Sequence, residues 1–149
     1  MNRKFYLLLL APVIIFASCS KSVPETQANI VGNWRIVSVE RQTQYGTQPV
    51  YTGYENGTFY FYNGGNAEYS DHIGQMDGTW RIVQRSDGYY DYNGNWRNDL
   101  RYSLELRLYD YYYDDAIEWE FYSIELSGGR MVGYMNRYGE DYRYEFRRY

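Results

Sequence analysis

The side chains that could carry out chemistry are few and widely spaced in this sequence. His72 is the only histidine, and it lies in the segment SDHIG (70–74). A Ser-His-Asp triad would have to use His72, but the sequence contains no nucleophile elbow to accompany it. An isolated histidine in a turn is more typical of a solvated side chain. We therefore expect the protein not to be an enzyme.

Two further segments are rich in oxygen ligands. The run YDYYYDDAIEWE (109–120) brings four carboxylates close together in the sequence: Asp110, Asp114, Asp115 and Glu118. Paired carboxylates can hydrolyse a glycosidic bond, but this pattern is more typical of a solvated loop and strand face. The segment DYNGNWRND (91–99) has the wrong spacing for an EF-hand, and we interpret it as a Tyr/Asn-rich hairpin. With one histidine and one cysteine the chain lacks the usual zinc ligands, so we expect neither a metal nor a cofactor.

The N-terminus combines a basic start, a short apolar run and the only cysteine, Cys19. Arg3 and Lys4 precede the apolar run 5–16, which is short for a permanent membrane span. The final four residues, Phe-Ala-Ser-Cys (16–19), resemble the cleavage box of bacterial lipoproteins, although that family prefers leucine where Phe16 stands. The resemblance implies cleavage before Cys19, lipidation (palmitate among the acyl chains) and, from Ser20, sorting to the outer membrane. The alternative is an ordinary secreted protein cleaved after Ser18.

These features divide the chain into a signal peptide (1–18), a lipidated Cys19 with a flexible tether (19–29) and one domain (30–149). Removal of the signal peptide takes away Arg3 and Lys4 and no acidic residue, so the formal charge falls from −4 to −6. An acidic domain argues against nucleic acid as a partner. Several acyl chains on one cysteine would hold the domain at a membrane surface, and we expect a monomer.

Alternating polar and apolar residues over most of the domain predict β-strands. The segments are near 33–42, 57–62, 66–71, 78–85, 101–109, 116–126, 130–136 and 141–148. In the segment 116–126 the alternation changes phase, which predicts a bulge near Tyr122 and Ser123. Sequential hairpins with one apolar face favour an all-β fold, a single antiparallel up-and-down β-barrel of about eight strands.

The phrase Gly-x-Trp-Arg-Ile-Val occurs twice, at 32–37 and at 78–83. We interpret the copies as two strands in which glycine permits a tight turn, tryptophan closes a barrel end and the aliphatic residues cover the wall. Gly32-Asn33-Trp34 at the start of the first strand resembles the lipocalin signature, and the length and strand count are similar to bacterial lipocalin-like domains. The resemblance implies that an arginine near the C-terminus packs on Trp34, with Arg147 the first candidate and Arg143 the second.

Two hypotheses of function follow. In the first, the barrel mouth binds a small apolar molecule through inward-facing aromatic residues: Trp34, Phe59, Phe61, Trp80, Trp119, Phe121 and Tyr144. Because such bulky side chains would fill much of a small barrel, a packed core without a ligand is an equal alternative. In the second, tyrosine-rich loops bind a glycan or a partner protein, with contacts from Tyr89, Tyr90, Tyr111 and Tyr112.

Overall fold

The computed structural model describes residues 23–149, which form one short helix and twelve β-strands. The elements are α1 (Val23–Ile30), β1 (Gly32–Thr43), β2 (Gly46–Pro49), β3 (Thr58–Phe61), β4 (Asn66–Ser70), β5 (Gln75–Arg85), β6 (Tyr89–Tyr90), β7 (Trp96–Arg97), β8 (Arg101–Asp110), β9 (Asp115–Phe121), β10 (Ser123–Ser127), β11 (Arg130–Arg137) and β12 (Glu140–Arg148). The predicted signal peptide and Cys19 lie outside the described residues.

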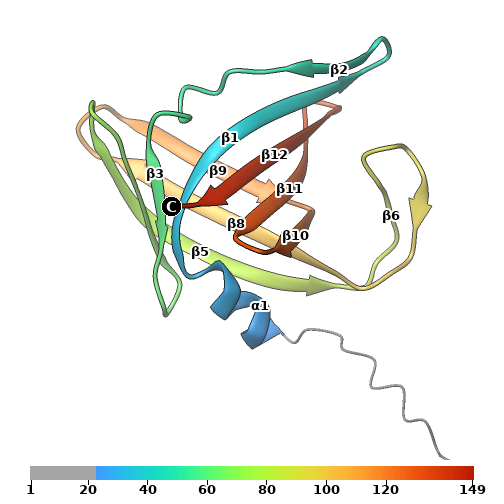
Figure 1. Ribbon diagram of the computed structural model, residues 1–149, viewed down its shortest axis with the longest axis horizontal. Coiled ribbons are helices and arrows are strands. Elements are labelled where there is room, and N and C mark those ends of the chain that lie inside the picture. Colours follow the sequence, from blue (N-terminus) through green and yellow to red (C-terminus); the bar gives the residue numbers. More distant parts are fainter. Residues whose placement is uncertain (1–22) are drawn as a thin grey trace, which may run out of the picture.

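All strand pairings are antiparallel, as predicted. One ten-stranded sheet runs in the order β10-β11-β12-β1-β3-β4-β5-β8-β9, with β2 paired to β1 (Figure 1). The two-residue strands β6 and β7 form a separate hairpin, which projects from the end of the sheet where β5 stops. The all-β fold class predicted from the alternation is confirmed.

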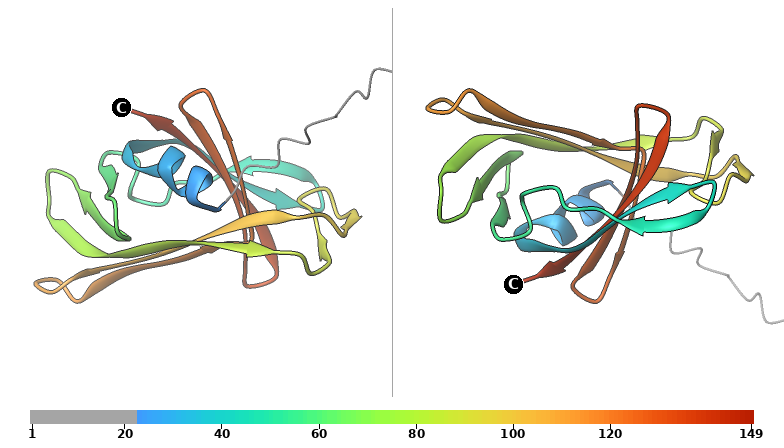
Figure 2. Two further views of the ribbon diagram at one scale, coloured as in Figure 1. Left: turned by 90° about the horizontal axis from the view of Figure 1, so that it is seen from below. Right: turned by 90° about the horizontal axis from the view of Figure 1, so that it is seen from above.

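The expected closed barrel of about eight strands is wrong. The sheet folds over on itself, with β5, β8 and β9 on one side and β1 on the other (Figure 2). Its two edge strands, β9 and β10, follow one another in the chain, but no ladder of hydrogen bonds joins them within residues 23–149. At the corner the amide of Tyr122 donates to the carbonyl oxygen of Tyr134 at 2.8 Å. The phase change predicted as a bulge is therefore a strand break, because β9 and β10 face the core from different parts of the sheet.

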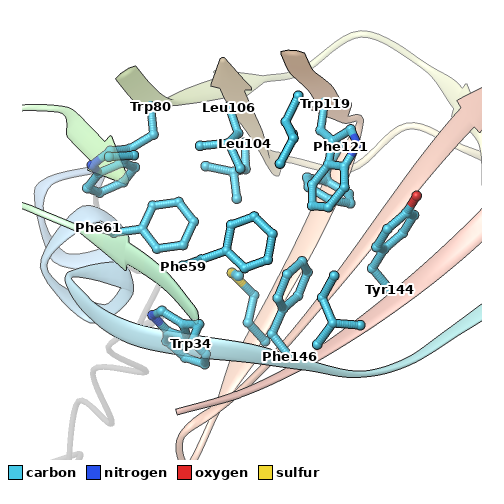
Figure 3. Close-up of a cluster of buried hydrophobic side chains, with 14 of the residues drawn as sticks. Trp34, Phe59, Phe61, Trp80, Leu104, Leu106, Trp119, Phe121, Tyr144 and Phe146 are labelled. Atoms are coloured by element: carbon cyan, nitrogen blue, oxygen red, sulfur yellow. The ribbon is translucent and has the colours of Figure 1, made fainter. Parts of the chain in front are cut away.

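The folded sheet encloses one apolar core built by the predicted alternation. On β8, Leu104, Leu106 and Leu108 are 0–1% exposed and point inward. Aromatic side chains from β3, β9 and β12 meet them in the centre (Figure 3). Aromatic side chains bury roughly 150–250 Å² each, so they dominate the stabilisation of the core.

The repeated phrase solves the same packing problem twice. Trp34 and Trp80 are 1% and 3% exposed, and each indole N–H donates to a backbone carbonyl, that of Ile30 at 2.6 Å and that of Tyr62 at 3.1 Å. The two glycines differ in role. Gly32 has a φ of +136°, which favours glycine, where the chain leaves α1 for β1. Gly78 lies inside β5, where a Cβ atom would stand 1.9 Å from the carbonyl oxygen of Arg107.

The predicted tether differs from the structure in its described part, because residues 23–30 form α1. Thr26 and Ile30 are buried against the sheet, at 2% and 0% exposure. Pro24 in the first turn is compatible with a helix. A helix of eight residues has little stability of its own, so packing against the sheet decides its formation.

Arg148, rather than the expected Arg147 or Arg143, packs on Trp34. Its guanidinium carbon lies 5.0 Å from the centre of the indole ring, because β1 and β12 pair in the register that places Arg148 opposite Trp34. The guanidinium also donates to the carbonyl oxygens of Asn29 and Val31 at 2.6 and 3.2 Å. Arg148 therefore joins the last strand to the helix-strand junction.

Arg147 and Arg143 instead surround Glu145, whose side chain is 13% exposed. Glu145 pairs with Arg130, Arg143 and Arg147 at 2.8, 2.9 and 3.2 Å. Hydrogen bonds from Arg130 and then Arg143 lower the pKa of Glu145 to about 2, against the opposing effect of burial. The carboxylate links β11 to β12 as a fully ionised group at neutral pH.

Candidate functional site

The seven aromatic residues predicted to contact an apolar ligand lie together in the core (Figure 3). Each is 6% exposed or less. Phe59 packs against Trp119 and Phe146 with ring centres 5.5 and 5.9 Å apart, and Trp119 packs against Tyr144 at 5.1 Å. Burial raises the pKa of Tyr144 to about 12, so its hydroxyl stays protonated. These contacts give the seven side chains a packing role.

The four tyrosines predicted to contact a glycan or a partner do not form one surface. Tyr89 is partly buried, whereas Tyr90, its neighbour on β6, is 67% exposed on the opposite face. Tyr111 and Tyr112 are 87% and 96% exposed in the turn between β8 and β9. That turn and the β6–β7 hairpin lie at opposite ends of the sheet (Figure 1).

The β6–β7 hairpin is organised by Asp91. Its Oδ1 accepts hydrogen bonds from the amides of Asn93 and Asn95 at 3.0 and 2.8 Å, and its Oδ2 accepts one from Nε of Arg97 at 2.8 Å. The Arg97 bond is the main cause of the lowered pKa of Asp91. Gly94, with a φ of +78°, completes the turn. The segment interpreted as a Tyr/Asn-rich hairpin therefore has that structure.

Arg101, the first residue of β8, fastens the hairpin to the sheet. It is 7% exposed, and its Nε donates to the carbonyl oxygen of Tyr122 at 2.9 Å. Its terminal nitrogens donate to the carbonyl oxygen and to Oδ2 of Asp87 at 2.5 and 3.2 Å. The guanidinium carbon lies 4.0 Å from the centre of the Tyr89 ring. One side chain thus positions both the start of the hairpin and the tyrosine on its inner face.

A pocket of about 300 Å³, called the hairpin pocket below, lies between the inner face of this hairpin and strands β10 and β11. Four tyrosine rings line it in a continuous series. The ring centres of Tyr89 and Tyr122 are 5.8 Å apart, those of Tyr122 and Tyr134 are 6.4 Å apart, and those of Tyr134 and Tyr92 are 5.6 Å apart. Of these four rings only Tyr89 was predicted from the sequence as a contact residue, from its tyrosine-rich loop, whereas the phase change at Tyr122 was the signal that could have indicated the corner of the sheet.

Polar groups complete the lining of the hairpin pocket: Asp91, Asn93, Arg97, Asp99, Ser123 and Glu125. Asp91 and Arg97 form an ion pair at 2.8 Å, and Asp99 and Glu125 add two further acidic groups. Burial, followed by the charge on Asp99, raises the pKa of Tyr89. Burial also raises the pKa of Tyr122, whose buried hydroxyl has no hydrogen-bond partner among residues 23–149. The pocket therefore combines ring faces with hydrogen-bonding groups.

The structure brings together some of the residues considered for catalysis and separates others. His72 is exposed in the turn between β4 and β5. Asp110 and Asp115 face one another as the last pair of the β8–β9 ladder. Glu118 accepts a hydrogen bond from the Tyr109 hydroxyl at 3.0 Å on the outer face of that hairpin. Asp110 also accepts hydrogen bonds from the amides of Tyr112 and Tyr113 in the turn that follows β8.

Comparisons with protein families, with curated proteins and with solved structures gave no match for this chain. The resemblance to lipocalin-like lipoproteins therefore stays a prediction. In the part of the chain that the structure describes, no helix is long and apolar enough to cross a membrane.

Proposed function

We propose that the protein is a non-enzymatic binding module of the cell envelope, whose hairpin pocket binds a saccharide. The observation that carries this proposal is the series of four tyrosine rings bordered by carboxylates, an amide and a hydroxyl. A sugar ring offers apolar C–H faces and a hydroxyl-bearing edge. Tyrosine rings suit the faces, and the polar groups of the rim suit the hydroxyls.

Size and polarity support the same assignment. Small-molecule sites span roughly 300–1,000 Å³, and the hairpin pocket is at the lower end, which suits one sugar or a short glycan. The pocket also offers exposed hydrogen-bonding groups, since Asn93, Asp99 and Glu125 all lie at the surface. Charged acceptors such as these carboxylates form the stronger hydrogen bonds to hydroxyl donors.

The hypothesis of an apolar ligand in the interior has less support. A ligand among the seven core aromatic residues would have to displace rings that already contact one another and are 0–6% exposed. Apolar molecules remain an arm of the binding experiment, in which quenching of tryptophan fluorescence by a fatty acid or a retinoid would favour the interior site.

The test is a glycan array probed with the full-length protein in detergent, followed by titration of the retained sugars. We expect Asp99→Asn combined with Glu125→Gln to weaken binding by about ten-fold or more, because both side chains are exposed acceptors on the rim. Tyr45→Ser is the matched control, since Tyr45 is 88% exposed in the β1–β2 turn. Retention of no sugar by the unaltered protein, or equal retention by the double variant, would refute the assignment.

The proposed location rests on the sequence of the leader. Lipidation of Cys19 would place the domain at the outer membrane. Cys19→Ala should release the protein into the soluble fraction after cell lysis. Continued partitioning of this variant into detergent would contradict the anchor without affecting the argument for the hairpin pocket.

A further inference from the structure

A second pocket, called the acidic pocket below, lies at the opposite end of β8. Its volume is about 310 Å³, and it opens between the β4–β5 turn, the β8–β9 turn and the segment before β3. Its floor consists of Tyr69 and Met76, at 3% and 6% exposure, and of Tyr54, whose ring meets that of Tyr69 edge-on at 5.3 Å. Ile73 and Tyr113 stand at its rim, each 69% exposed. The pocket therefore has an aromatic and aliphatic wall.

Three carboxylates line the same pocket, and no lysine or arginine does. Among residues 23–149, none of Asp71, Asp110 and Asp115 forms an ion pair. Asp71 accepts hydrogen bonds from the amides of Ile73 and Gly74 at 2.7 and 3.0 Å and from the Tyr69 hydroxyl at 2.9 Å. Despite the opposing effect of burial, the two amides lower its pKa, so Asp71 is ionised at neutral pH. Within the part of the chain that the structure describes, no ion pair offsets the acidic lining of the pocket.

Asp110 is the carboxylate with an unused acceptor. It is 8% exposed, and its Oδ1 accepts the amides of Tyr112 and Tyr113 at 2.8 and 3.1 Å. No described residue donates a hydrogen bond to Oδ2. A Cβ atom at Gly74 would stand 3.1 Å from this oxygen, so the glycine leaves it uncovered. Asp110 is therefore a largely buried carboxylate whose second oxygen stays open to the pocket, where a cation or a hydrogen-bond donor can reach it.

From this geometry we infer that the acidic pocket binds a small alkylammonium ion, whose ammonium group donates to Oδ2 of Asp110 and whose alkyl chain packs on Tyr54, Tyr69 and Ile73. The three carboxylates supply the charge complement, and the tyrosine rings supply the apolar surface for the alkyl chain. Within the described residues the carboxylates are not grouped as a metal site, which favours an organic cation over a metal ion. This site is independent of the hairpin pocket.

The experiment is a titration of the full-length protein, observed by calorimetry, with n-butylammonium and with 1-pentanol as a neutral analogue of similar length. We expect saturable binding of n-butylammonium, weakened by salt, and no binding of 1-pentanol at the same concentration. Equal binding of the two compounds would overturn the inference, because it would show an apolar pocket. Binding of Nα-acetyl-lysine amide, which keeps its side-chain ammonium group, without binding of n-butylammonium would also overturn it. The site would then recognise a lysine within a peptide.

Substitutions locate the site. Asp110→Asn keeps an oxygen for the two turn amides and removes the charge, so we expect a folded protein that binds n-butylammonium roughly ten-fold or more weakly. Asp114→Asn is the matched control, because Asp114 lies exposed in the same turn and does not line the pocket. An unchanged affinity of Asp110→Asn, with its fold verified by circular dichroism, would overturn the assignment.

Discussion

Replacement of Arg101 by glutamine should loosen the β6–β7 hairpin and weaken saccharide binding in the hairpin pocket. The buried hydrogen bond from Nε to the Tyr122 carbonyl carries most of the effect, because a bond from a charged donor is worth about 1.5–3 kcal/mol. The ion pair with Asp87 adds little, since the Asp87 side chain is 65% exposed and water screens its charge. Stacking on Tyr89 adds about 0.5–2 kcal/mol.

These contributions share one side chain and are not additive, so we expect a total loss of about 2–4 kcal/mol. Urea unfolding, followed by tryptophan fluorescence, measures the loss of stability of the whole domain. Hydrogen exchange of the segment 86–100 measures the local part, which should rise more than exchange in β8 and β9. Arg107→Gln is the control, because Arg107 is exposed on the same strand.

Saccharide binding should fall in the Arg101→Gln protein although Arg101 does not line the hairpin pocket. The reason is that Arg101 positions Tyr89 and the Tyr122 backbone. The proposed role of Arg101 is refuted if the free energies of unfolding of the variant and the unaltered protein differ by less than about 0.5 kcal/mol and the amides of the segment 86–100 exchange at the same rate in both.

Three further substitutions test the fold. Glu145→Gln should lower the free energy of unfolding at pH 7 by roughly 1–3 kcal/mol. The difference between the two proteins should vanish as the pH falls from about 4.5 to 2, because a lowered carboxyl pKa stabilises the fold only above that range. A difference in the free energy of unfolding that persists at pH 2 would contradict this reasoning. Gly78→Ala should cost more than about 2 kcal/mol, since its Cβ would meet the Arg107 carbonyl, and an unchanged melting temperature would exclude the clash. Trp34→Phe should cost about 1–3 kcal/mol by leaving the buried Ile30 carbonyl unpaired; equal midpoints in urea would show that the indole bond is dispensable.

Most strands could be predicted because alternation reports burial directly. In the segment 101–110, every second residue from Leu104 to Leu108 is buried, and the intervening Glu105 and Arg107 face outward. The predicted bounds of the long strands differ from the observed bounds by at most a few residues. β2, β6 and β7 were not among the predicted strands, because strands of two to four residues contain too little alternation to recognise; for β6 and β7 only the hairpin in the segment 91–99 was predicted.

The sequence did not show whether the sheet closes into a barrel. The sheet is open where the chain passes from β9 to β10, and only one residue separates these two strands. A phase change in alternation has the same appearance whether the chain forms a bulge or leaves one strand for another. At Tyr122 the chain passes from the edge formed by β9 to the edge formed by β10. An irregularity in pairing lies elsewhere, between Ile36 and Ser38, where β1 meets β12 and Val37 is 53% exposed.

The position of both pockets follows from how the strands use their side chains. The leucines in the centre of β8 are 0–1% exposed and pack in the core. Arg101 at the start of the strand holds the wall of the hairpin pocket in place, and Asp110 at its end lines the acidic pocket. Aromatic residues that alternate on strands are drawn into the core, and their ring faces are then occupied by one another. Tyrosines in segments without alternation, such as 86–100 and 111–114, keep a face or an edge available, and strand residues next to them, such as Tyr134 and Tyr69, complete the two pockets. Both pockets therefore lie at the ends of β8, where loop residues meet the sheet.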